Sequence, residues 1–92
     1  MSRKRVYNQE SIDIQSRFWQ ALDFLCRENK INGLRTYSRL YNIDARNFYA
    51  QQKDQTKGHF QAGWLVPLVN VYHISPRWIL TGNGNMTTAH YR

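Results

Sequence analysis

Acidic residues, cysteines and long apolar runs are all scarce in this sequence of 92 residues. Six Asp/Glu stand against thirteen Lys/Arg, which gives a net charge of +7 at pH 7. The single Cys26 excludes an internal disulfide and a cysteine-based zinc site. No apolar run approaches the ~18 residues that a membrane-spanning helix needs, and the basic start lacks the apolar stretch of a signal peptide. We therefore expect one small, soluble, cytoplasmic domain with no membrane partner.

Residue patterns typical of catalysis and of metal binding are also missing. His59, His73 and His90 are too far apart to form a recognisable metal-binding motif. No glycine-rich phosphate loop occurs, because the Gly82-Asn83-Gly84 stretch follows a predicted helix instead of opening one. We expect a protein that is not an enzyme, with no cofactor, no metal and no evident small-molecule effector.

The positive charge is concentrated in the middle of the chain and at its beginning. Residues 11–30 sum to zero, residues 31–57 to +3, and residues 1–10 to +2. Nucleic acid, an anionic membrane surface and an acidic protein are the usual partners of such a chain, and charge alone does not choose among them. For the basic arm of residues 1–10, with Arg3, Lys4 and Arg5, insertion into a DNA minor groove and a solubilising tail both stay open.

Apolar spacing and helix-end residues predict about five short helices and no strand. Phe18, Leu22, Leu25 and Cys26 form a helical stripe within residues 11–29. Further helices are expected over 34–41, 45–53 and 76–81, the last between a Ser-Pro start and a glycine just past its end. One more helix is expected in the apolar block 60–73, with its start near 62–65, because Pro67 is tolerated best in a first turn. The fold class is therefore all-α, with a helix-turn-helix domain over 11–86 and a C-terminal tail over 87–92. The polar stretch 83–92 has no periodicity, and we expect it to be frayed.

Two of these helices, 34–41 and 45–53, have the pattern of a helix-turn-helix. Ser38 provides a small residue at the close approach of the helices, and Asn42 tolerates the left-handed turn conformation. Ile43 is expected to pack the turn against the core, and Asp44 to cap the second helix. Phe48 is expected to be the buried residue that holds the second helix against the core. Trp64 and Trp78 are expected in the interior, since each lies on an apolar helical face.

Two segments of the sequence have distinctive motifs. The stretch from Ile74 to Met86 reads ISPRWILTGNGNM, and the stretch from Tyr37 to Asp44 reads YSRLYNID. The first resembles the closing helix, and the second the first motif helix and turn, of phage and bacterial regulators related to the lambda repressor and Cro. The resemblance covers about residues 16–86, and Gln51 stands where the family often has a second apolar anchor.

The resemblance implies a sequence-specific transcriptional regulator of the phage or mobile-element repressor type. Such a domain binds double-stranded DNA, often as a homodimer on a palindromic site, with residues 45–53 as the recognition helix in the major groove. Its place in the cell would then be the cytoplasm, associated with the nucleoid. The candidate DNA contacts are Arg35, Arg39, Asp44, Ala45, Arg46, Asn47, Tyr49, Ala50, Lys53 and Lys57.

Within this set, Arg46 and Asn47 are expected to select bases, and Arg35 and Lys53 to hold phosphates. Asp44 is expected to cap its helix more than to contact DNA. A second hypothesis stays open, in which the chain is a protein-interaction adaptor that keeps this fold without reading DNA, for example within a toxin–antitoxin or mobile-element complex.

Overall fold

A computed structural model of the chain describes residues 8–88. The basic residues Arg3, Lys4 and Arg5 and the last four residues lie outside this range. The described elements are, in order, α1 (Gln9–Arg27), α2 (Leu34–Leu40), α3 (Ala45–Lys53), the 3₁₀ helix η1 (Ala62–Leu65), α4 (Val66–Asn70) and α5 (Pro76–Thr81). The expected all-α class with five α-helices is confirmed, and the described part of the chain contains no strand. Over residues 8–88, none of the helices has the length and apolar character needed to cross a bilayer.

The helix ends follow local capping rules. Asp44 and Ser75 cap α3 and α5 as predicted, and Gly82 takes the left-handed conformation, at φ 80°, just past α5. The first helix does not begin at residue 11, where the predicted segment starts. The helix begins two residues earlier, and the side chain of Asn8 accepts the hydrogen bond from the Ser11 amide.

In the apolar block of residues 60–73, helical structure begins at Ala62, within the predicted start, as η1, and continues as α4 from Val66. Pro67 lies in the first turn of α4, where its missing N–H costs no helical hydrogen bond. The residues before it therefore form the tighter 3₁₀ turn, and Trp64 of that turn is buried.

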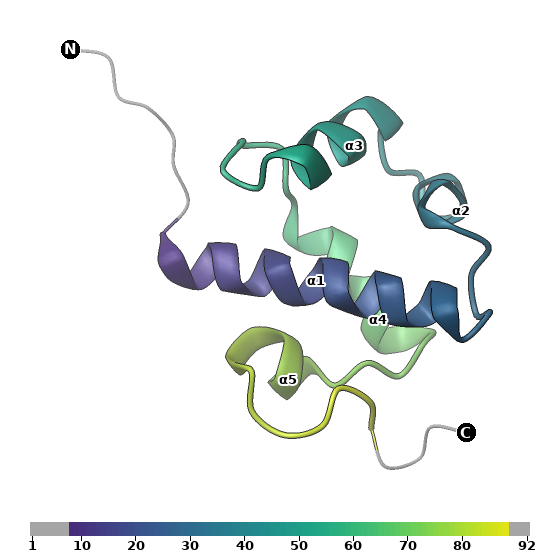
Figure 1. Ribbon diagram of the computed structural model, residues 1–92, viewed down its shortest axis with the longest axis vertical. Helices are drawn as coiled ribbons and strands as arrows, with labels where there is room; N and C mark the ends of the chain where they lie inside the picture. The colour runs from purple at the N-terminus through teal and green to yellow at the C-terminus, as the bar shows by residue number, and fades with distance from the viewer. Residues whose placement is uncertain (1–7, 89–92) are drawn as a thin grey trace.

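Helix α1 is the centre of the molecule (Figure 1). It passes between α2 and α3 on one side and α5 on the other. Its buried residues include Phe18, Leu22 and Leu25, which join Tyr37, Phe48 and others in one core. The longest helix thus provides the surface on which the helix-turn-helix rests.

Arg17 links α1 to the end of α5. Its Nε donates to the Ile79 carbonyl at 2.8 Å, and its Nη2 donates to the Leu80 carbonyl at 3.2 Å. A Cβ at Gly82 would lie 3.1 Å from Nη1 of Arg17, so a side chain there would crowd the guanidinium. The last carbonyls of a helix lack intrahelical donors, and Arg17 satisfies two of those of α5.

The expectation of a frayed tail from residue 83 onward is wrong for residues 86–88. Ile74 and Thr87 form an antiparallel bridge. The Ser75 amide donates to the Met86 carbonyl at 2.7 Å, and the Thr88 amide donates to the His73 carbonyl at 3.0 Å. This pairing is a long-range contact that helical periodicity does not encode.

The two predicted core tryptophans differ in burial. Trp64 is 5% exposed, whereas Trp78 packs against the core but stays partly exposed. Its neighbour Ile79, at 1% exposure, takes the inward position of α5. The prediction of a buried Trp78 is therefore wrong, because the short helix α5 places its inward direction one residue later.

Alanine substitutions should reveal this difference. Trp64→Ala should lower the free energy of unfolding by about 3–5 kcal/mol, and Trp78→Ala by roughly 1–3 kcal/mol, because less apolar area is lost. Urea unfolding at equilibrium measures both values. Equal losses in the two variants would contradict the assigned burial.

Alkaline pH should weaken the fold through two partly buried tyrosines. The Tyr41 and Tyr72 hydroxyls lie 2.9 Å apart. Burial, with the hydrogen bond to Tyr41, raises the pKa of Tyr72 from 10.0 to about 12. Because the folded state holds this proton more tightly, its contribution to stability is complete below pH 10 and is lost as the pH rises toward 12. The Tyr72→Phe variant should lose stability less steeply between pH 10 and 12 in urea titrations, and an unchanged slope would contradict the assignment.

Candidate nucleic-acid interface

The turn between α2 and α3 has the hydrogen bonds that hold a helix-turn-helix. Ser38 is 3% exposed, and its Oγ donates to the Arg35 carbonyl at 2.9 Å. Asn42 has φ 57°, the left-handed conformation predicted for it. The Ile43 amide then donates to the Ser38 carbonyl at 2.9 Å. The angle between the two helices is thus set by a small buried residue and a permissive turn residue.

Asp44 acts in the structure as the cap of α3. Its Oδ1 accepts hydrogen bonds from the amides of Arg46, at 2.8 Å, and Asn47, at 3.2 Å. These amides belong to the first turn, where no helical carbonyl is available to accept them. The predicted capping role of Asp44 is confirmed.

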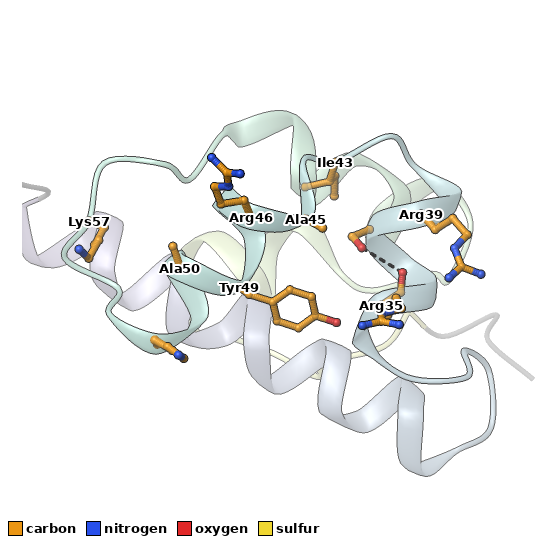
Figure 2. Close-up of a pocket in the computed structure, with 10 residues that line it drawn as sticks. Arg35, Arg39, Ile43, Ala45, Arg46, Tyr49, Ala50 and Lys57 are labelled. Atoms are coloured by element: carbon orange, nitrogen blue, oxygen red, sulfur yellow. Dashed lines mark hydrogen bonds between the residues drawn. The ribbon is translucent and has the colours of Figure 1, made fainter.

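Between α2 and α3 lies a hollow of about 890 Å³, which we call the basic groove (Figure 2). Ten residues line it: Arg35, Ser38, Arg39, Ile43, Ala45, Arg46, Tyr49, Ala50, Lys53 and Lys57. Two of its arginines come from α2, and Lys57 comes from the loop after α3. The groove is therefore built by the helix-turn-helix and the segment that follows it.

Helical periodicity explains why α3 presents these residues together. Arg46, Tyr49, Ala50 and Lys53 are spaced i, i+3, i+4 and i+7, which places them on one face. The opposite face holds the buried Phe48 and Gln51. Ala50 adds little bulk to the groove face, and the Tyr49 ring extends from α3 on the side of α2 (Figure 2). The exposed face of α3 is thus open and not filled by the protein's own side chains.

The charge of the groove has one sign. Five of its ten lining residues are Lys or Arg, and none is Asp or Glu. Within residues 8–88, none of these five cations forms an ion pair, since the ion pair described there joins Arg27 to Asp23 on α1. Five unpaired cations around one hollow favour an anionic ligand.

The two carboxylates of the helix-turn-helix region have other partners. Asp44 accepts the two amide bonds at the start of α3. Asp54 accepts from the Thr56 hydroxyl at 2.6 Å and from the Thr56 amide at 3.1 Å. These bonds, with the hydroxyl first, lower the pKa of Asp54 below its ordinary value. Both acids are therefore held in helix-end and turn structure, and neither lines the groove, although the charge of Lys57, which does, also lowers the pKa of Asp54.

The structure brings together eight of the ten predicted contact residues. Asp44 and Asn47 are the exceptions. Asn47 is partly buried and lines a separate hollow of about 390 Å³ that also includes Gln61 and Trp64. It follows Arg46 directly, so the helix rotates its side chain away from the groove.

Sequence reasoning missed residues both in the groove and behind it. Ser38 and Ile43 line the groove, although the sequence suggested packing roles only. Behind α3, Gln15 and Gln51 are both fully buried and hydrogen-bonded to each other. The available signal was a glutamine at an inward helical position, three residues after Phe48, where the resembled family often has an apolar side chain.

Protein-family models, curated proteins and solved structures were each compared with the chain, and none of the three comparisons finds a significant match.

Proposed function

We propose that this protein is a sequence-specific double-stranded DNA-binding regulator that inserts α3 into the major groove. The observation that carries the proposal is the basic groove, with its five unpaired cations and no acid. Phosphate neutralisation by Lys and Arg supplies most of the non-specific affinity of DNA-binding proteins. The resemblance to lambda-repressor-like regulators supports the same reading.

The dimensions of α3 suit the DNA major groove. An α-helix with its side chains is about 10–12 Å in diameter, and the major groove, about 12 Å wide, admits one such helix. Arg35 and Arg39 lie on one side of the exposed α3 face, and Lys57 follows its C-terminal end. In this proposal they contact phosphates, and the α3 face between them contacts base edges.

Arg46 is the leading candidate for base readout. It lies in the first turn of α3, the part of a recognition helix that reaches base edges. Its guanidinium can donate two hydrogen bonds to one guanine. The Tyr49 ring and the Ala50 methyl group offer apolar contacts that suit the thymine methyl group.

Selection of bound fragments from a random double-stranded DNA pool tests the proposal directly. We expect an enriched motif, with two related half-sites if the protein binds as a homodimer. Absence of enrichment, together with binding that stays weak at low salt, would contradict DNA recognition. The adaptor hypothesis would then be the better account, and capture of a specific protein partner would support it.

The contribution of the groove cations to DNA affinity can be separated from that of the total charge of the protein. Arg35→Ala should weaken binding to selected and scrambled DNA alike, and should make the slope of log affinity against log salt shallower by about 0.9, because one phosphate contact is lost. Arg77→Ala is the matched control, since it removes an exposed arginine of α5, outside the groove. Equal effects of the two substitutions would indicate a general charge effect and contradict a phosphate contact at Arg35.

Base selection should depend on Arg46 more than on its neighbour. Arg46→Ala should cost about 1–3 kcal/mol on the selected site and reduce the preference over scrambled DNA. Asn47→Ala should reduce that preference less, because Asn47 lines the other hollow. Titrations of both variants with selected and scrambled duplexes measure the ratio. A preference that survives Arg46→Ala would exclude this residue as the reader.

A further inference from the structure

The most unusual feature of the interior is a pair of buried amides behind α3. Gln15 of α1 and Gln51 of α3 are both 0% exposed. The Nε2 of Gln51 donates to the Oε1 of Gln15 at 2.5 Å and to the Gln55 carbonyl at 2.9 Å. The Oε1 of Gln51 accepts from the His59 amide at 3.1 Å. One side chain therefore holds both α1 and the loop that follows α3.

The backbone partners fix the orientation of both amides. A backbone N–H only donates and a carbonyl only accepts, so the oxygen of Gln51 must face His59 and its nitrogen must face Gln55. The same nitrogen faces Gln15, which must therefore present its oxygen. The Nε2 of Gln15 then has no acceptor among the described residues. Both the nitrogen and the oxygen of the Gln51 amide are therefore hydrogen-bonded, whereas only the oxygen of the Gln15 amide is.

Packing alone does not explain an amide at position 51. A leucine would fill a similar volume without the cost of removing an amide from water. Hydrogen bonds of the Gln51 amide offset this desolvation cost, and two of the three are made to the loop of residues 54–59. Its effect is therefore to fix the conformation of that loop.

Two sets of hydrogen bonds hold the loop of residues 54–59, one exposed to solvent and one buried. Thr56 binds Asp54 at its start, where water competes for the same groups. The Lys57 amide donates to the Asp54 carbonyl at 3.1 Å. The buried hydrogen bonds are those of the Gln51 side chain, which binds the backbone of Gln55 and of His59, on both sides of Lys57. Lys57 is thus presented to the basic groove between two residues held from the interior.

We propose that Gln51 is a positioning residue, whose buried amide holds the loop of residues 54–59 so that Lys57 completes the basic groove. The inference rests on the proposed function for its effect on DNA, whereas the effect on the loop does not depend on DNA. The groove then requires a polar residue at a position where packing alone favours an apolar one.

The first measurement is amide hydrogen exchange by NMR on the free protein. In Gln51→Leu, exchange of the His59 amide should be faster by about tenfold, as expected when one internal hydrogen bond is lost. Gln15→Leu leaves the bonds of Gln51 to the loop in place and should keep the His59 amide protected. Gln52→Leu, at an exposed neighbouring position of α3, controls for the added leucine. Unchanged protection in Gln51→Leu would overturn the proposal.

The second measurement asks whether Gln51 acts through Lys57. Gln51→Leu and Lys57→Ala should each make the salt slope of DNA binding shallower, by up to about 0.9. Combining them should give no further loss of affinity, because the second change removes a contact already lost. If the double variant instead loses affinity by the product of the two single fold-losses, Gln51 and Lys57 act independently and the proposed coupling is wrong.

Failure of the proposed function is distinguishable from failure of this inference. If the unmodified chain shows no salt-dependent DNA binding, the function fails, and the exchange experiment alone decides whether Gln51 holds the loop. If Gln51→Leu does not fold, the double variant Gln15→Leu/Gln51→Leu replaces it, since removing both buried amides leaves no unpaired group between the helices. Protection of the His59 amide must be lost in that variant too, or the inference is wrong.

Discussion

The packing of aromatic rings around Phe18 determines where the helix-turn-helix lies. Phe18 projects from α1 and its ring centre is 5.9 Å from that of Tyr37 on α2, 6.3 Å from that of Phe48 on α3, and 6.1 Å from that of Trp64 on η1. The Tyr37 hydroxyl donates to the Trp64 carbonyl at 2.6 Å, which joins two of these neighbours. Aromatic pairs of this kind add to the free energy gained by burial. Because α2 and α3 contact the same ring, their relative position is fixed from behind, and their outer faces are left to form the basic groove.

The helices and much of the candidate site could be predicted because both depend on local signals. The turn at Asn42, the cap at Asp44 and the glycine at 82 act within a few residues of their own position. Once the inward residue Phe48 is known, the 3.6-residue period assigns the outer face of α3. The same rule predicts an interior Trp78, which is only partly buried, whereas Ile79 is the buried residue of α5. A six-residue helix has too few turns for its sequence to define a face sharply.

What could not be predicted depends on contacts between distant parts of the chain. Arg17 of α1 binds carbonyl groups of α5 more than sixty residues away, and no local signal predicts this contact. The pairing of Thr87 with Ile74 and the amide pair of Gln15 and Gln51 are of the same kind. Each is a polar contact between residues that only the packing of distant segments brings together. Periodicity records which face of a helix is apolar, but not which polar group it will meet.

The charges of α3 agree with the helix dipole at one end of the helix and oppose it at the other. Asp44 at the start and Lys53 in the last turn are both favourable, since the N-terminal end carries partial positive charge and the C-terminal end partial negative charge. Arg46 lies in the first turn, where a cation is disfavoured by a few tenths of a kcal/mol or more, and it has no carboxylate partner among the described residues. Residues that break a local rule without a compensating contact are expected at functional sites. Gln51, on the buried face of this helix, also departs from what packing alone favours, although hydrogen bonds compensate its amide. On α3, therefore, two residues differ from what stability alone favours, and they lie on opposite faces. Arg46 faces the basic groove, and Gln51 faces the interior, where it binds the loop that completes the groove.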